Sequence, residues 1–200
     1  MQLFGNKLHL DTRGKQSAGD DILQVIEKAK GGDRRAQKAI YDSLSGKMYA
    51  VCLRYMADRD TAADVLQDGF VTLFTKLDSF SGEGSFEGWA RKIFVNTALM
   101  ALRKNDILKQ TEDVEEARFI SSDAPTAMED IGYRELMKII EELPPGFRTV
   151  FNMYVIEGYS HKEIGETLGI SEVTSRSQLQ RARTLLQSKI KEKYQDAGKK

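Results

Sequence analysis

Apolar side chains recur along this chain at the spacing of three and four residues that places them on one face of an α-helix. In the N-terminal half the spacing is clearest in residues 22–29, 36–44, 48–56 and 61–77. No stretch shows the sustained alternation that is typical of a half-buried strand. The three prolines lie between helical patterns and not inside them, at Pro125, Pro144 and Pro145. The pattern therefore predicts an all-α fold.

A distinct arrangement of polar and apolar positions begins at Ser160. Ser160 and Glu163 have the spacing of a capping box, so a short helix is expected to start here. Gly169 is expected to end that helix, and Ser171 can cap the next one. The stripe that the second helix buries consists of Ser175, Leu179, Ala182 and Leu186. Two helices joined by a short turn predict a helix-turn-helix unit.

The outward face of this second helix is polar and basic. On a helical wheel, the positions that point away from the buried stripe or lie on its flank are Glu172, Val173, Arg176, Ser177, Gln180 and Arg183. Residues 171–193 hold six Lys or Arg against two Glu, a net charge of +4. A merely solvated face has a similar composition, but the capped helix, the short turn and the local charge together favour DNA binding.

Charge varies strongly along the chain, although its 30 basic and 30 acidic residues cancel in total. Residues 112–130 hold seven acids against Arg118, a net charge of −6, and have little apolar periodicity. This composition predicts a flexible acidic linker between two small helical domains. The predicted units are a flexible N-terminal arm at 1–19, a first domain at 20–105, the linker at 106–130, a second domain at 131–193 and a tail at 194–200.

Several classes of chemistry have no support in the sequence. The single cysteine, Cys52, has apolar neighbours and predicts a buried free thiol. His9 and His161 lie far apart, without metal-ligand or nucleophile spacing, so we expect no catalytic residue, no metal and no cofactor. Apolar runs stay far below the roughly 18 residues of a membrane span, and the N-terminus lacks the apolar region of a signal peptide. We therefore expect a cytoplasmic protein that is not an enzyme and does not insert into a membrane.

The first domain has two segments of opposite charge. Residues 58–87 carry seven acids and two bases, a net charge of −5, and are expected to repel DNA. Residues 88–104 carry four bases and no acid, a net charge of +4, on a helix that also holds Asn96. That second segment is expected to attract DNA.

Taken in order, these segments resemble the extracytoplasmic-function sigma factors of bacterial RNA polymerase. The matching pieces are "DVLQDGF" before a polar Gly-rich loop, then "FEGWARKIFVNTALMALRK", and after the linker "LPPGFRTVFNMYVIEGYSHKEIGETLGISEVTSRSQLQRAR". The resemblance implies sigma domain 2, a helical bundle, followed by sigma domain 4, a helix-turn-helix domain. The style of the last piece is similar to that of Bacteroidetes members. Residues 1–19 lie outside the resemblance.

The resemblance also implies roles for individual residues. It assigns docking on core RNA polymerase to Asp64, Gln67 and Asp68. Recognition and melting of the promoter minus-ten element falls to Ser81, Gly82, Gly84, Ser85, Arg91, Lys92 and Asn96. Recognition of the minus-thirty-five element falls to Arg148, Lys162, Ser171, Glu172, Val173, Arg176, Ser177, Gln180 and Arg183. A plain surface loop and an exposed helix face remain the alternatives for the minus-ten loop and for the acidic docking residues.

Two further features refine this picture. The helical spacing of Phe86, Trp89 and Phe94 favours core packing over base stacking. Family members commonly carry Gly and Val where this chain has Val173 and Ser175. The recognition helix therefore loses one branched core residue and gains an apolar residue on its outward face.

We interpret the chain as an alternative sigma factor whose partners are core RNA polymerase, promoter DNA and an anti-sigma factor. The anti-sigma partner follows from the family alone. One rival class is a stand-alone helix-turn-helix regulator, which needs a dimer surface or a receiver domain. Another is a helical module that binds only proteins.

Overall fold

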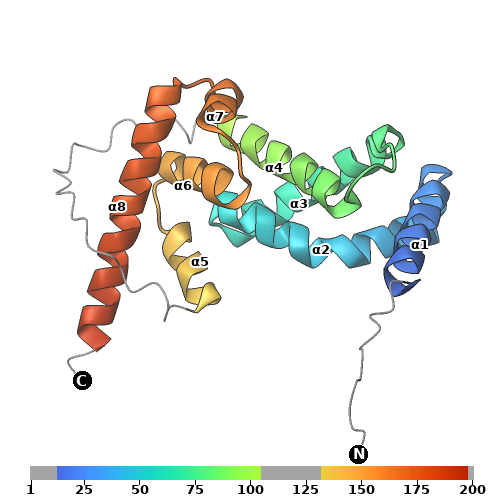
Figure 1. Ribbon diagram of the computed structural model, residues 1–200, viewed down its shortest axis with the longest axis horizontal. Coiled ribbons are helices and arrows are strands. Elements are labelled where there is room, and N and C mark those ends of the chain that lie inside the picture. The colour runs from blue at the N-terminus through green and yellow to red at the C-terminus, as the bar shows by residue number, and fades with distance from the viewer. Residues whose placement is uncertain (1–12, 105–131, 198–200) are drawn as a thin grey trace, which may run out of the picture.

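The computed structural model describes residues 13–104 and 132–197, and all regular structure in these two ranges is helical (Figure 1). The first range holds α1 (Arg13–Lys30), α2 (Arg34–Met56), α3 (Arg59–Thr75), the short 3-10 helix η1 (Leu77–Ser79) and α4 (Phe86–Lys104). The second holds α5 (Tyr133–Glu141), α6 (Pro145–Phe151), the π-helical turn η3 (Asn152–Ile156), α7 (His161–Leu168) and α8 (Glu172–Ala197). The all-α prediction is confirmed for the described residues.

In the N-terminal half (α1–α4), local sequence signals explain where α2 and α3 begin. The Asp33 carboxylate accepts hydrogen bonds from the backbone amides of Arg35 and Ala36 and so caps α2. The Asp58 carboxylate caps α3 in the same way, through the backbone amide of Thr61 at 2.8 Å. These caps satisfy amide groups that have no partner within their own helix.

The apolar stretches at 36–44 and 48–56 form one helix, α2, and not two. Their buried residues continue a single stripe across the join, from Leu44 to Met48. Gly46, which lies at the join, is exposed and has no side chain within 4 Å of its position, so it neither bends nor ends the helix.

In the C-terminal half (α5–α8), the two adjacent prolines stand between α5 and α6. Pro145 occupies the first turn of α6, where its missing amide hydrogen costs no helical bond. Pro144 therefore separates α5 from α6, as the sequence predicts for both prolines. Pro125 lies outside the described residues, and so does the whole predicted acidic linker.

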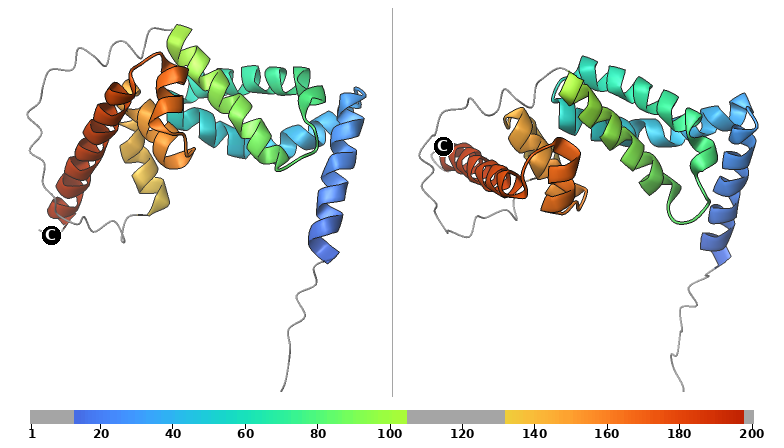
Figure 2. Two further views of the ribbon diagram at one scale, coloured as in Figure 1. Left: turned by 45° about the horizontal axis from the view of Figure 1, so that its top comes forward. Right: turned by 90° about the horizontal axis from the view of Figure 1, so that it is seen from above.

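The two halves pack against each other through the C-terminal end of α2. Figures 1 and 2 show α6 between α2 and α8, with α1 and α8 towards opposite ends of the molecule. The buried side chains of both halves belong to one continuous hydrophobic cluster. Cys52 of α2 is fully buried in it, as predicted, and burial raises the pKa of its thiol to about 12.

Helix bounds differ from the predicted unit bounds at both ends of the chain. Helix α1 begins at Arg13, inside the predicted arm at 1–19, and α8 continues to Ala197, inside the predicted tail. Among the described helices, none combines the length and the apolar character that crossing a membrane requires.

Candidate nucleic-acid interface

The helix-turn-helix begins with the predicted cap. The Ser160 hydroxyl accepts the backbone amide of Glu163 at 3.2 Å, while the Glu163 carboxylate accepts the backbone amide of Ser160 at 2.8 Å. These hydrogen bonds hold the pKa of the Glu163 carboxyl below its ordinary value. Gly169 ends α7 in the left-handed conformation, with φ of 72°. The capping box and the helix stop are therefore confirmed.

The turn between α7 and α8 also needs Gly165, which the sequence reasoning did not single out. A Cβ atom at Gly165 would stand 2.8 Å from the carbonyl oxygen of Ile170, closer than such atoms approach. Ile170 leads directly into Ser171, whose hydroxyl accepts the backbone amide of Thr174 at 2.9 Å and caps α8.

The faces of α8 follow the predicted stripe. Its buried positions include Ser175, Leu179, Ala182 and Leu186. The exposed positions include Glu172, Val173, Arg176, Ser177, Gln180 and Arg183. Val173 is the most exposed large apolar side chain among the described residues, at 74%. The structure confirms the prediction that these residues of α8 are exposed to solvent.

A buried polar contact ties the two helices of the unit together. The Ser175 hydroxyl is fully buried and lies 2.9 Å from Nδ1 of His161, the first residue of α7. The His161 ring stacks on Tyr154, with ring centroids 4.4 Å apart. Desolvation by burial, and then the charge of Arg176, lowers the pKa of His161. Ser175 therefore has a hydrogen-bond partner inside the core, where a branched apolar residue could offer none.

The two other predicted minus-thirty-five residues have different surroundings. Lys162 is exposed at the start of α7. Arg148 is only 5% exposed, and its guanidinium donates to the backbone carbonyls of Tyr55, Glu141 and Leu143 at 2.8–3.2 Å. Burial lowers the pKa of Arg148. In this arrangement Arg148 is not available to DNA, because every direction in which its donors point is occupied by protein.

The predicted minus-ten loop connects η1 to α4 and is exposed throughout residues 81–85. Gly82 and Gly84 have φ of 82° and 76°, which a residue with a side chain rarely adopts. Both serine hydroxyls serve the loop itself: Ser85 accepts the backbone amide of Gly88 at 3.2 Å, and Ser81 that of Glu83 at 3.3 Å. The glycines thus shape the loop, and the serines hold it in place.

On α4 the three predicted minus-ten residues separate into two groups. Lys92 and Asn96 are exposed and one helical turn apart, so they share one outward face. Arg91 is half-buried, and its Nη1 lies 3.4 Å from Oε2 of Glu157 in the C-terminal half. Of the three, Arg91 is therefore the one that forms an ion pair with the other half of the molecule, while the charge of Lys92 acts on Glu163 of that half at longer range.

The aromatic residues around the loop form a core, as predicted. Phe86 and Trp89 stack at 5.6 Å, and Phe80 contacts both rings at 5.2 and 5.4 Å. Phe94 is fully buried against Phe70. Phe80, which the helical spacing did not assign, is also buried, at 4% exposure.

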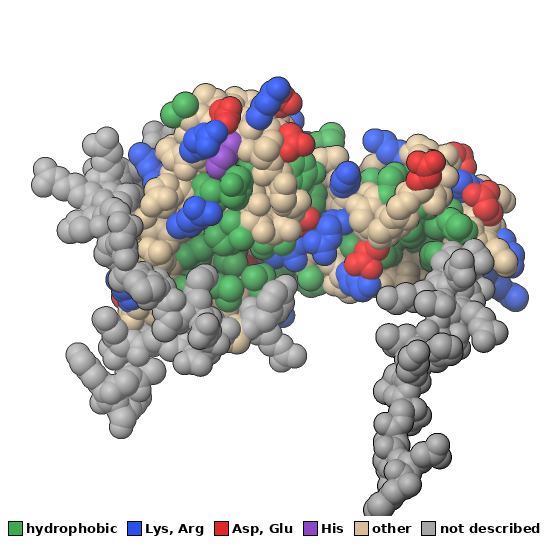
Figure 3. All heavy atoms as spheres, viewed as in Figure 1, with side chains coloured by type: hydrophobic (Ala, Val, Ile, Leu, Met, Phe, Trp, Pro, Cys, Tyr) green, Lys and Arg blue, Asp and Glu red, His purple; other side chains and the backbone are tan. Residues whose placement is uncertain are grey.

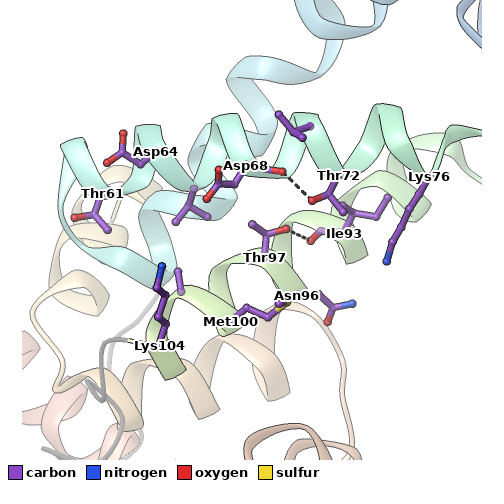
Figure 4. Close-up of a pocket in the computed structure, with 13 residues that line it drawn as sticks. Thr61, Asp64, Asp68, Thr72, Lys76, Ile93, Asn96, Thr97, Met100 and Lys104 are labelled. Atoms are coloured by element: carbon purple, nitrogen blue, oxygen red, sulfur yellow. Dashed lines mark hydrogen bonds between the residues drawn. The ribbon is translucent and has the colours of Figure 1, made fainter.

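The predicted polymerase-docking residues lie on the exposed face of α3. Asp64 and Asp68 line a groove of about 690 Å³ between α3 and α4, and Gln67 is exposed beside them. Figure 4 shows Asn96, Met100 and Lys104 of α4 across this groove from the two aspartates. Val71 and Met100, both 67% exposed, add apolar surface to its walls.

Positive side chains gather on the face that carries the helix-turn-helix. Figure 3 shows Lys and Arg over α7 and α8 on this side of the molecule. Arg176 also forms an ion pair with Glu172 one turn earlier on the exposed surface. Such exposed pairs contribute little and exchange easily, so Arg176 stays accessible to another partner. Across the described ranges, no group of His, Cys, Asp or Glu side chains is arranged to hold a metal ion.

Comparisons with known proteins agree with this geometry. Residues 40–107 match the family model "Sigma-70 region 2", and residues 133–186 match "Sigma-70, region 4". The chain is 27% identical over 177 residues to an ECF RNA polymerase sigma-E factor of Haemophilus influenzae, covering 83% of this chain and 93% of that protein. It is also 27% identical over 187 residues to the RNA polymerase sigma-H factor of Pseudomonas aeruginosa, covering 87% and 96%.

A solved structure is similar as well, with a TM-score of 0.48 and 23% identity over 77% of this chain and 96% of the other. It is the sigma factor RpoE of Bartonella quintana in complex with the anti-sigma factor NepR. The two family models together span α4 and the helix-turn-helix as far as residue 186 of α8, in the order that the sequence predicts. The chain belongs to the extracytoplasmic-function sigma factors of the sigma-70 family.

Proposed function

We propose that this sigma factor binds core RNA polymerase through α3, reads the minus-thirty-five element with α8 and opens the minus-ten element with α4 and its preceding loop. The observation that carries the proposal is the exposed basic face of α8, which stands on a buried stripe within a capped helix-turn-helix. A helix presented in this way can enter the major groove of DNA.

Within α8 the expected contacts change with distance from the helix start. Recognition helices insert their first turns into the groove, so Arg176 and its neighbours Val173 and Ser177 are proposed to meet base edges. Arg183 stands seven residues further on, about 10 Å along the axis, and is proposed to meet phosphate. Lys162, at the start of α7, is proposed as another phosphate contact.

At the minus-ten element, α4 and the loop at 81–85 are proposed to bind bases that have left the duplex. The side-chain amide of Asn96 can make two hydrogen bonds to an adenine edge, while Lys92 holds phosphate. Unstacking a base costs a few kcal/mol, and contacts made only by an exposed base offset that cost. The loop at 81–85 adds backbone donors at Gly82 and Gly84, which lack side chains that would keep a base away.

The docking surface for core polymerase is proposed to be the exposed face of α3. Asp64, Gln67 and Asp68 offer carboxylates and an amide, which suit a basic partner surface. The apolar wall formed by Val71 and Met100 next to the aspartates supports this choice, because docking surfaces combine apolar area with a polar rim.

Other elements of the proposal rest on family membership. These are an anti-sigma factor as a further partner, a cytoplasmic location where polymerase works, and a likeness to Bacteroidetes members. The division into domains at residues 20–105 and 131–193 also remains our proposal.

Run-off transcription with core polymerase on a promoter library tests the proposed function. We expect transcripts only when both core polymerase and this chain are present, and no footprint of the chain alone on duplex DNA. A footprint of the isolated chain on a palindromic site would instead favour a stand-alone regulator.

The variant Asn96→Ala should reduce open complexes, measured by permanganate reactivity of promoter thymines, more than it reduces closed binding.

A further inference from the structure

Helix α1 packs against the segment that leads into the minus-ten loop, residues 81–85. Both views of Figure 2 show α1 beside the turn that links α3 to α4. Ile26 of α1 and Leu77 of η1 are both buried in the hydrophobic core of this region. All of α1 precedes residue 40, where the match to sigma-70 region 2 begins. The minus-ten loop therefore has a neighbour that lies outside the matched region.

Lys30, the last residue of α1, holds the residue directly before the loop. Its Nζ donates to the backbone carbonyl of Phe80 at 3.3 Å and lies 2.8 Å from Oε1 of Glu27, one turn earlier. The side chain of Lys30 is only 19% exposed, because its apolar stem lies along protein and only its tip is polar. A hydrogen bond from a charged donor is stronger than a neutral one. Lys30 thus fixes the backbone at the point where the chain enters the loop.

Leu23, two turns before Lys30, contacts the loop itself. A Cβ atom at Gly82 would stand 3.7 Å from Cδ2 of Leu23, which is the distance of ordinary van der Waals contact. Residues seven apart lie on the same face of a helix, so Leu23 and Lys30 face the loop together. The hydrogen bond of Lys30 to Phe80 and the approach of Leu23 to Gly82 are called the α1–loop contact below.

A lysine near a DNA-binding loop could also serve as a phosphate contact. Lys28 of the same helix has the exposure that such a contact needs. Lys30 differs from it, because the Phe80 carbonyl and the Glu27 carboxylate both accept from its ammonium group, and the carboxylate offsets its charge. These surroundings favour an effect of Lys30 on the geometry of the loop over an attraction of DNA.

We propose that Lys30 is a positioning residue for the minus-ten loop, and that the α1–loop contact holds residues 81–85 in the conformation that receives an unstacked base. Gly82 and Gly84 give the loop backbone many conformations when nothing restrains it. Ordering such a loop on binding costs free energy, and a contact that orders it beforehand lowers that cost. The positioning role rests on the proposed minus-ten function of the loop, whereas the α1–loop contact does not.

Lys30→Met tests the α1–loop contact, because methionine keeps the apolar stem and removes the donor and the charge. The matched control is Lys28→Met, which removes the same charge from an exposed position of the same helix. A spin label at Glu83→Cys, an exposed loop position outside the proposed DNA contacts, reports loop motion by electron paramagnetic resonance in the free protein. Cys52 is fully buried and does not take up label.

We expect a mostly immobile label in the wild type and in Lys28→Met. In Lys30→Met the ratio of mobile to immobile label should rise about fivefold or more, as the loss of one hydrogen bond from a charged donor implies. Lys30→Arg keeps a charged donor and should restore the immobile spectrum. Identical spectra of wild type and Lys30→Met, at equal helix content by circular dichroism, would overturn the α1–loop contact, and so would an equal change in Lys28→Met.

Leu23→Ala tests the same contact through its apolar part. It should also raise the mobile fraction of the label, because it removes the side chain that approaches Gly82. Leu23 is 38% exposed, so its truncation leaves the core of the protein intact. This variant decides the question if Lys30→Met does not fold, and an unchanged spectrum would then overturn the α1–loop contact.

Transcription with core polymerase from a promoter library with randomised minus-ten positions tests the positioning role. Lys30→Met should lower the base preference at one minus-ten position about fivefold and leave the minus-thirty-five preference unchanged, while Lys30→Arg should restore it. A uniform loss of activity with unchanged preferences would overturn the positioning role. A salt slope lowered by about one would overturn it too, since Lys30 would then be a phosphate contact. Failure of the wild type to start transcription would overturn the proposed function and the positioning role with it, but not the α1–loop contact, because the label spectra involve no DNA.

Discussion

Helices α4 and α8 both carry a basic, polar face, but they present it in different ways. On α8 the exposed residues, such as Arg176 and Arg183, stand on the outside of a short two-helix unit. On α4 the exposed face is split, because Lys92 and Asn96 point outward while Arg91 meets Glu157 of the other half. One face is thus complete within its own half, and the other depends on where the other half lies.

This difference shows that helical spacing reports exposure well only when nothing else packs on the helix. The buried stripe of α8 follows from its sequence alone, and its outward residues follow with it. For Arg91 and Arg148 the spacing allowed solvent contact, but long basic side chains also reach carbonyl ends and carboxylates of another element. Variants in each half can test how far this contrast holds.

The largest effect is expected when a buried arginine is compared with an exposed lysine, both of which the sequence assigned to the minus-thirty-five element. Arg148→Met keeps much of the apolar stem but leaves the carbonyls of Tyr55, Glu141 and Leu143 without a donor. We expect the free energy of unfolding in urea to fall by about 3 kcal/mol or more. Lys162→Ala should change it by less than about 0.5 kcal/mol. Equal, small losses would mean that Arg148 is exposed in solution.

Alanine substitutions at two glycines compare the close-packed turn of the C-terminal half with the open middle of α2. Gly165→Ala forces a Cβ against the Ile170 carbonyl and should destabilise the protein by about 1–3 kcal/mol. Gly46→Ala meets no neighbour and should stabilise it by about 1 kcal/mol through helix propensity. Thermal unfolding of both variants measures the contrast, and a stable Gly165→Ala protein would show that the turn relaxes.

Two arginines on the same face of α8 are expected to make different kinds of contact with DNA, one with bases and the other with phosphate. Arg176→Ala should relax the preference at one or two base pairs of the minus-thirty-five element by about 1–3 kcal/mol. Arg183→Ala should weaken all promoters alike and lower the salt slope of binding by about one. Transcription from a promoter library at two salt concentrations distinguishes them. A uniform loss for Arg176→Ala would remove it from the residues that read bases.

The smallest effect is expected at His161, where burial and then Arg176 lower the pKa of the imidazole below its ordinary value of 6.5. As the pH falls through 6.5, the unfolded chain takes up a proton before the folded chain does. The stabilising contribution is therefore complete above that pH and is lost as the pH falls towards the lower folded pKa. Urea unfolding at about pH 7.5 and about pH 5.5 should show a larger loss for the wild type than for His161→Gln. The same loss in both proteins would assign the pH dependence to other groups.

Much of the site could be predicted because its signals are local. A serine three residues before a glutamate forms the capping box at Ser160 and Glu163, and a glycine at Gly169 can take a positive φ. These features involve neighbours in the chain, whose distances are set by helix geometry. The close approach at Gly165 was missed because the atom that excludes a side chain there belongs to the turn beyond the helix.

The sequence by itself determined the helical class, the two functional units and the buried and exposed faces of α8, since helical periodicity and caps act within a few residues of each other. Only the tertiary structure decided the contacts of Arg148, Arg91 and Glu157, because each has a partner 66 to 103 positions away along the chain. A periodic pattern carries no information on which distant carbonyl or carboxylate a long side chain will meet. That choice depends on the packing of α6 against the end of α2. There, carbonyl groups that lack an amide partner within the helix accept hydrogen bonds from buried side chains, and buried charges pair with each other.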